Sequence, residues 1–282
     1  MASAYEDYAR TAAHYDGTRL ASGVELVLGC LARGPVPLGE QRVLDAGCGT
    51  GNYLAALAGH VGSLVGVDAN PEMLAEARRK LGGRADVALE RADLPAFDPP
   101  AGAFDGILCS QVLHHLDRGG AVREDFPGVA AFLAAAARAL RPGGSLLVNT
   151  CSPAQLRDGV WWSPLIPAAI ERAGRRFPPL ELLRELLGEA GLRVEAEWVQ
   201  LDGLVFGERY LDPRGPLEPA WRAGDSTWSL ATPGELGAAL ERLERLLAAG
   251  EVGAFLAERE RRRRSVGQTT FLWARAAGPE SH

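Results

Sequence analysis

Several residue types and patterns are scarce in this sequence, and each absence excludes a class of protein. Its four cysteines among 282 residues form no CxxC pair and no cluster with histidine, so neither a zinc site nor a disulfide framework is predicted. No apolar run approaches the roughly 20 residues of a membrane span, and the opening stretch MASAYEDYAR does not resemble a secretion signal. We therefore expect a cytoplasmic protein with reduced cysteines and no bound metal.

The chain also lacks a surplus of positive charge. Its formal net charge is -6, and Lys80 is its only lysine among 30 basic residues. An acidic chain repels nucleic-acid backbones and anionic membrane surfaces, so neither is an expected partner. The arginine run at 261–264 is the main exception. Because arginine replaces lysine almost throughout the chain, we interpret this run as the solvated face of a helix.

What the sequence does contain, between residues 42 and 150, is an alternation of short apolar runs and amphipathic helical stretches. This alternation is typical of a parallel sheet covered by helices. We therefore predict an α/β fold, doubly wound, with a mostly parallel seven-stranded sheet and helices on both faces. The predicted strands are 42–46, 64–68, 86–90, 104–110, 145–150, 192–201 and 268–276.

Two irregular segments, 151–178 and 202–264, interrupt or follow this pattern. They are too long to be simple loops, so we expect them to form a helical, substrate-covering cap. The core would then comprise 40–201, apart from the first insertion, together with 265–277, and lid helices would occupy 1–39. The aromatic side chains of the insertions suit either an aromatic or apolar acceptor or the core of the cap itself. They are Trp161, Trp162, Phe206, Tyr210, Trp221 and Trp228.

The most specific motif is VLDAGCGTGN, residues 43–52, in which three glycines follow a short apolar run that ends in an acid. A strand, a glycine loop and a helix in this order place backbone N–H groups at the carboxyl edge of the sheet, where such folds bind ligands. The dinucleotide pattern GxGxxG needs glycine where Asn52 stands, and the phosphate loop GxxxxGK[ST] is missing. The acid Asp45 suits a ligand that carries a positive group.

At this loop the sequence resembles the class I methyltransferases that use S-adenosyl-L-methionine and release S-adenosyl-L-homocysteine. The resemblance rests on DAGCGTG, an acid that ends the second strand, RADLPAF, FDGILCSQVLHHL and LRPGGSLLVN, in that order. It implies that Asp45 orients the ammonium group of the cofactor and that Asp68 binds its ribose hydroxyls. The implied cofactor-binding residues are Tyr15, Arg19, Asp45, Gly47, Cys48, Gly49, Gly51, Asn52, Asp68, Ala69, Met73, Ala92, Asp93, Leu94, Ser110 and Gln111.

In the family the adenine ring lies against residues that correspond here to Met73 and to 92–94. The N-terminal stretch YEDYARTAAHYDGTR is similar to a lid helix of small-molecule members. There Tyr15 and Arg19 would close over the cofactor, with Arg19 on the methionine carboxylate. The alternative is that both side chains simply pack against or cap an amphipathic helix.

His114, in the loop after the fourth strand, is the candidate catalytic base. The sulfonium methyl is already activated, so the enzyme must align the acceptor and, for a hydroxyl, remove a proton. An imidazole titrates near neutral pH, and His115 would then point the other way. The alternative is that the histidine pair orders the loop. The resemblance implies methylation of a small-molecule acceptor, a metabolite or natural product, at oxygen or nitrogen.

Other functions share parts of this pattern. A tRNA wobble-uridine methyltransferase carries a similar HisHisLeu loop, although the acidic charge balance opposes it. A non-catalytic S-adenosylmethionine-binding protein would keep the cofactor residues without turnover. An arsenite methyltransferase needs several converging thiols, for which Cys48, Cys109 and Cys151 are candidates near strand ends. A nicotinamide dehydrogenase is disfavoured by Asn52.

Overall fold

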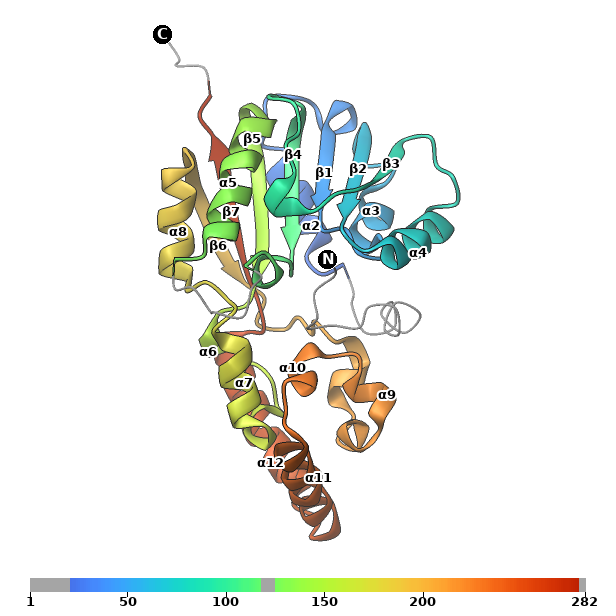
Figure 1. The fold of residues 1–282 in the computed structure, drawn as a ribbon, viewed down its shortest axis with the longest axis vertical. Helices are drawn as coiled ribbons and strands as arrows, with labels where there is room; N and C mark the ends of the chain where they lie inside the picture. Colours follow the sequence, from blue (N-terminus) through green and yellow to red (C-terminus); the bar gives the residue numbers. More distant parts are fainter. Residues whose placement is uncertain (1–20, 118–124, 279–282) are drawn as a thin grey trace.

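The structure, a computed structural model, describes residues 21–117 and 125–278. Its centre is a seven-stranded sheet of order β3-β2-β1-β4-β5-β7-β6 (Figure 1). All neighbouring pairs from β3 to β5 are parallel, and β7 runs antiparallel between β5 and β6. The predicted α/β fold with a mostly parallel sheet is thus confirmed. The strands are β1 (Arg42–Ala46), β2 (Ser63–Asp68), β3 (Val87–Arg91), β4 (Phe104–Ser110), β5 (Leu140–Thr150), β6 (Leu192–Val199) and β7 (Thr270–Ala276).

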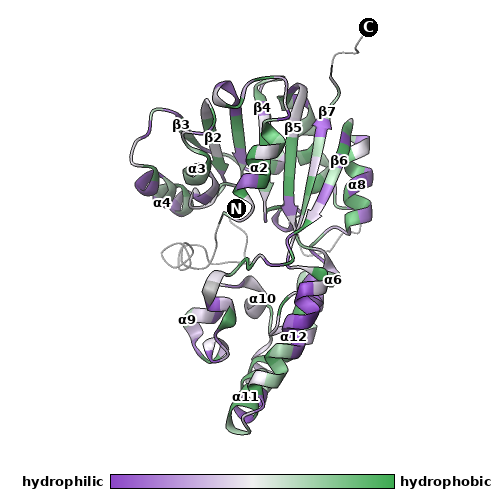
Figure 2. Cartoon of the chain, turned by 180° about the vertical axis from the view of Figure 1, so that it is seen from behind, coloured by the Kyte–Doolittle hydropathy of each residue, from purple (hydrophilic) through white to green (hydrophobic). Residues whose placement is uncertain are grey.

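Helices cover both faces of the sheet (Figure 1). Successive strand residues point to opposite faces, so Leu44 joins one buried cluster and its neighbour Val43 joins the other. The strands β4 and β5 are buried along most of their length, as expected for strands covered by helices on both sides, and the middle of β5 is hydrophobic (Figure 2). The covering helices are α2 (Val24–Leu31), α3 (Asn52–Leu57) and α4 (Pro71–Leu81) on one face, with α5 (Pro127–Ala139) and α8 (Leu180–Glu189) on the other.

The fifth strand begins earlier than predicted. The predicted strand was 145–150, but β5 already starts at Leu140. Its pairing with β4 jumps from Leu140 opposite Phe104 to Ser145 opposite Gly106, so the intervening residues form an irregular bulge. Gly143 supplies the positive φ of +77° that the bulge requires.

The two insertions pack together beyond the carboxyl edge of the sheet, and we call this part the cap (Figure 1). They share a cluster of buried side chains that is distinct from the two clusters of the sheet. No helix within the described ranges is long and apolar enough to cross a membrane. The cap contains α6 (Pro153–Asp158), α7 (Pro167–Gly174), α9 (Pro219–Arg222), α10 (Ser226–Ser229), α11 (Pro233–Ala248) and α12 (Val252–Val266), with short 3-10 turns between them.

The aromatic side chains of the insertions form the core of the cap. Trp161, Trp162 and Tyr210 are fully buried. The ring of Trp162 lies 4.9 Å, centroid to centroid, from both Phe206 and Trp221 in edge-to-face contacts. The indole N–H of Trp161 donates to the Tyr210 carbonyl at 2.6 Å. Of the two uses expected for these rings, the structure shows core packing.

The arginine run of α12 is not wholly solvated, contrary to the prediction. Arg263 is only 3% exposed. Its guanidinium donates to the carbonyls of Leu201 at 2.7 Å and Gly203 at 3.3 Å, and it pairs with Glu260 at 2.9 Å. Four consecutive helical residues span more than one turn, so one of them must face inward where α12 packs beside the end of β6. The other three arginines of the 261–264 run are exposed, as predicted.

Candidate functional site

The glycine loop follows β1, at the point where the strand order reverses between β1 and β4. The N–H groups of Gly47 and Cys48 both donate to the Val67 carbonyl, at 2.8 and 2.9 Å, and the N–H of Gly51 donates to the Cys48 carbonyl at 2.8 Å. The φ of Gly47 is +80°, and a Cβ at this position would lie 2.4 Å from a methyl group of Val112. Glycine is therefore required both for the backbone conformation and for the close approach of the loop after β4.

Asp68 holds the glycine loop against the end of β2. One carboxylate oxygen accepts a hydrogen bond from the N–H of Gly49 at 2.9 Å, and the other accepts from the N–H of Asn70 at 2.8 Å. Sequence reasoning assigned Asp68 to the ribose hydroxyls only. The structure shows that this carboxylate positions the backbone of the loop itself.

Asp45 is a buried carboxylate with one orphaned oxygen. It is 2% exposed, and its Oδ2 atom has no hydrogen-bond partner among the described residues. Burial, and to a smaller extent the nearby charge of Asp68, together raise the pKa of Asp45 to about 7. A buried acceptor without a partner is unfavourable, and a cationic donor would satisfy it. The sequence-based expectation of a positively charged ligand group therefore fits this site.

A small pocket opens beside the loop, lined by strand ends, the start of α3 and one residue of the cap. Its lining includes seven residues that the sequence assigned to the cofactor: Asp45, Gly47, Cys48, Gly49, Asn52, Ser110 and Gln111. The side-chain oxygen of Asn52 also accepts a hydrogen bond from Lys80. Tyr15 and Arg19 lie outside the described residues.

The residues expected around the adenine ring lie at the ends of β2 and β3, outside the lining of this pocket. The N–H of Ala92 donates to the Asp68 carbonyl at 3.1 Å, which joins the two strand ends. Met73 is 2% exposed, and Leu94 belongs to a core cluster. Four further members of the predicted set lie outside the lining of the pocket. They are Asp68, which holds the glycine loop, Gly51, which caps α3, Ala69, which follows β2, and Asp93, which caps a 3-10 turn after β3.

Sequence reasoning missed five lining residues of the pocket. Asn149 stands near the carboxyl end of β5, so the rule that ligands bind at this edge would have found it. Its side-chain N–H donates to the Ser110 hydroxyl at 3.2 Å. Val205 comes from the cap and has no local signal, because only long-range packing brings it here. The missed residues are Ser22, Thr50, Tyr53, Asn149 and Val205.

The loop after β4 is held in a strained conformation. Gln111 has a φ of +55°, which is unusual for a residue with a Cβ. Its N–H donates to the Asn149 carbonyl at 2.8 Å, and the Cys151 thiol donates to its side-chain oxygen at 3.6 Å. These contacts fix the start of the turn that carries the histidines, so the strain is localised at the site.

His114 belongs to the short 3-10 helix η3 (Leu113–His115), which begins two residues after Gln111. Its ring stacks on Phe177, with centroids 4.2 Å apart and an interplanar angle of 19°. The rings of His114 and His115 are also in contact, with centroids 3.9 Å apart. The expectation that His115 points the other way is wrong, because the tight turn places the two neighbouring rings side by side. His114 does not line the pocket at the glycine loop, whereas Phe177 lines a larger cavity of about 1180 Å³ in the cap.

Comparison with known proteins identifies the family. A model of the methyltransferase domain matches residues 43–144, which span the glycine loop, Asp68 and the histidine turn. A ubiquinone biosynthesis O-methyltransferase of Thiobacillus denitrificans is 30% identical over 179 residues, which cover 60% of this chain and 70% of that protein. The chain belongs to the class I S-adenosylmethionine-dependent methyltransferases.

Two further comparisons place this methyltransferase among its relatives. A methyltransferase of Mycobacterium tuberculosis, itself described as uncharacterized, is 31% identical over 126 residues, so the match spans 45% of this chain and only 58% of that relative. The solved structure of a putative methyltransferase from an antibiotic biosynthesis pathway of Anabaena variabilis has a TM-score of 0.68 at 22% identity, covering 89% of this chain and 96% of that one. At that identity the likeness shows the shared fold.

The cofactor of the family is S-adenosylmethionine, and the site of this methyltransferase fits it. The buried Asp45 oxygen that lacks a partner is placed to accept a hydrogen bond from a cationic ammonium group. The glycine loop leaves the end of β1 open for a ligand that approaches its backbone closely. A pyrophosphate would instead place negative charge beside two carboxylates, Asp45 and Asp68, which is unfavourable.

Proposed function

We propose that this protein transfers the methyl group of S-adenosylmethionine to an oxygen or nitrogen atom of a small-molecule acceptor. The observation that carries the proposal is the buried Asp45 carboxylate beside a left-handed glycine loop at the switch point of the sheet. When bound, the cofactor supplies an activated sulfonium methyl group. The chain's own residues would hold it, with Asp45 on the ammonium group, Asp68 on the ribose, and Met73 and 92–94 around the adenine.

The cap supports a small acceptor. It stands over the carboxyl edge of the sheet and contributes Val205 to the pocket at the glycine loop. We infer that the core, 40–201 without the first insertion and 265–277, binds the cofactor, and that the cap encloses the acceptor and excludes water. Oxygen as the methylated atom is supported by the Thiobacillus denitrificans relative, which is named as an O-methyltransferase.

We propose His114 as the base that removes the acceptor proton. Its ring lies at the carboxyl edge of β4 and is held by stacking on Phe177. In the variant His114→Ala, kcat should fall by about a hundredfold on a hydroxyl acceptor while the affinity for the cofactor stays unchanged. The matched control is His60→Ala, which removes an exposed imidazole in the turn after α3. A near-normal rate in His114→Ala would remove the base role and leave alignment alone to drive transfer.

Calorimetry tests the cofactor assignment directly. Wild type should bind S-adenosylmethionine and S-adenosylhomocysteine but not NADH. Asp68→Ala should lower the affinity for both ligands by about tenfold or more, because it removes a charged acceptor and leaves the N–H groups of Gly49 and Asn70 without this partner. Glu72→Ala, which removes an exposed carboxylate nearby, should bind normally. Binding of NADH alone would contradict the proposal.

A turnover assay separates an enzyme from a cofactor-binding protein. Conversion of S-adenosylmethionine to S-adenosylhomocysteine is followed across a panel of hydroxylated and amino acceptors. Tight cofactor binding with no turnover on any acceptor would favour the binding protein. The arsenite alternative loses support from the structure, because burial raises the pKa of both Cys48 and Cys109 and so disfavours their reactive thiolates.

A further inference from the structure

The cap contains a cavity of about 1180 Å³ between α6, α7 and α12. That volume exceeds the roughly 300–1,000 Å³ of typical small-molecule pockets, so it is large enough for a drug-sized ligand. One part of its wall is apolar and includes Phe126, Ile170 and Phe177. Phe177 is also the ring that stacks on His114. The cavity therefore extends to the ring on which the proposed base is stacked.

Another part of the wall is basic, so its charge is opposite in sign to the net charge of the whole chain. The net charge of the protein is -6. Within the cavity lining, however, four arginines face two carboxylates. These charged residues are Arg157, Arg175, Arg259, Arg262, Asp158 and Glu171.

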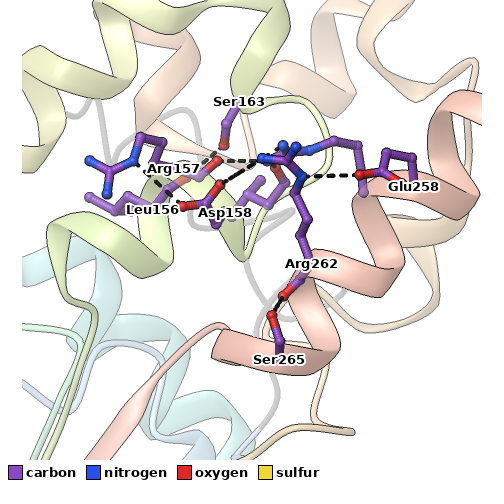
Figure 3. Close-up of polar contacts among 9 residues, drawn as sticks. Leu156, Arg157, Asp158, Ser163, Glu258, Arg262 and Ser265 are labelled. Atoms are coloured by element: carbon purple, nitrogen blue, oxygen red, sulfur yellow. Dashed lines mark hydrogen bonds and ion pairs between the residues drawn. The ribbon is translucent and has the colours of Figure 1, made fainter.

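Asp158 is shared by three of the arginines, two of which, Arg157 and Arg262, are labelled beside it in Figure 3. Its carboxylate lies 3.5 Å from Nε of Arg157, 3.7 Å from Nη1 of Arg262 and 4.0 Å from Nη1 of Arg259. Glu258 is a second partner of Arg262, at 3.2 Å. Two carboxylates do not neutralise three guanidinium groups, so the cluster keeps a net positive charge beside the cavity.

Arg259 carries the least compensated charge of this cluster. It is 7% exposed, and its Nε has no hydrogen-bond partner among the described residues. One Nη2 contact, to the Arg157 carbonyl at 2.7 Å, fixes its side chain at the cavity wall. Burial of a cation is unfavourable unless an anion lies close, and its nearest carboxylate is at the 4.0 Å limit of an ion pair. An anionic group in the cavity would supply the missing compensation.

We propose that the acceptor of this methyltransferase has an apolar body and an anionic group, a carboxylate or a phosphate, bound by the arginines of the cap cavity. The inference rests on the proposed function, because it assigns the cavity to the methyl acceptor. The apolar body would lie toward Phe177, which leaves the reacting atom near His114. Guanidinium groups bind both carboxylates and phosphates through paired N–H donors, so the structure assigns the charge class and the experiment distinguishes the two groups.

Three matched probes test the charge class: naphthalene-2-carboxylate, naphthalene-2-carboxamide and 2-naphthyl phosphate. Their affinities are measured by calorimetry, with and without saturating S-adenosylhomocysteine. At least one anionic probe should bind about tenfold more tightly than the carboxamide, because the charge-assisted contacts are stronger than neutral ones. The tighter of the two anions identifies the group. Equal binding of all three probes, or binding of none at millimolar concentration, would overturn the proposal.

Single substitutions locate the binding site. Arg175→Met and Arg262→Met should each weaken binding of the anionic probe about three- to tenfold and leave binding of the carboxamide unchanged. The effect is moderate because both guanidinium groups are partly solvated. The control is Arg261→Met, because Arg261 is adjacent in α12 but does not line the cavity. An equal loss of affinity for the anionic probe in Arg261→Met would contradict the assignment of the anion to this cavity. If wild type failed to bind S-adenosylhomocysteine, the proposed function would be refuted instead. The preference of the cavity for anionic probes, measured without S-adenosylhomocysteine, is a separate result and would show whether the cavity binds anions.

Discussion

At the residue scale, Asp45 combines a structural disadvantage with a binding advantage. Burial raises its pKa from 3.8 to about 7, so the folded protein holds this proton more tightly than the unfolded chain does. The folded state therefore loses stability as the pH rises from the unfolded value toward 7. A bound ammonium group favours the ionised carboxylate, so the same burial that destabilises the empty site strengthens the attraction to a cation.

Asp45→Asn should separate these two effects. Without cofactor, the variant should be more stable than wild type at pH 8, by on the order of 1–4 kcal/mol in the free energy of unfolding, and the difference should disappear near pH 4. The affinity for S-adenosylmethionine should fall at the same time. Denaturant titrations at both pH values and calorimetry measure the two changes, with the exposed Asp202→Asn as the control. A stability gain that is independent of pH would contradict the raised pKa.

At the element scale, the sequence predicts the strands and the glycine loop well because local rules govern both. The expected strand 104–110 matches β4 to the residue, since a buried apolar run has a clear beginning and end. The start of β5 was misplaced because a bulge leaves no apolar signature. Arg263 was misread for a related reason: the hydrophobicity of α12 does not show which arginine faces the neighbouring segment.

The glycine loop and the turn after β4 form one unit, and Gly47→Ala tests how tightly they fit. The new Cβ would meet Val112 at 2.4 Å and would also require a left-handed φ, so the free energy of unfolding should fall by about 2–4 kcal/mol. Adding Val112→Ala removes the closest contacts and should restore about half of the loss. Gly29→Ala, in the middle of α2 with open space around it, should be neutral or stabilising. Urea denaturation of wild type and these three variants measures the effect, and no rescue by Val112→Ala would exclude the steric cause.

At the scale of the whole molecule, the sequence predicts that a cap exists but not what it does. The predicted cofactor residues follow one another along consecutive strand ends, so linear motifs are enough to predict them. The Phe177 contact with His114, the entry of Val205 into the pocket and the arginines around Asp158 each join segments far apart in the chain. No local pattern encodes such contacts, so the proposal for the acceptor depends on the folded structure.

Arg263 ties α12 to the segment that leads from β6 into the cap, and its loss should loosen the cap selectively. Arg263→Met keeps the length of the side chain but leaves the carbonyls of Leu201 and Gly203 and the carboxylate of Glu260 without this donor. The free energy of unfolding should fall by about 2–4 kcal/mol, as for the removal of one partner from a buried charged network. Hydrogen exchange should rise mainly in α12 and α6, which pack together, and remain slow in β1 and β4.

The exposed Arg264→Met is the matched control for this tether, because it removes the same charge from the adjacent position of α12. It should change neither the stability nor the exchange pattern by a measurable amount. If Arg263→Met instead accelerated exchange equally in the cap and the sheet, the two parts would unfold as one cooperative unit. A selective increase in the cap would mean that the cap opens on its own, which is the motion an enclosed acceptor site needs to take up substrate and release product.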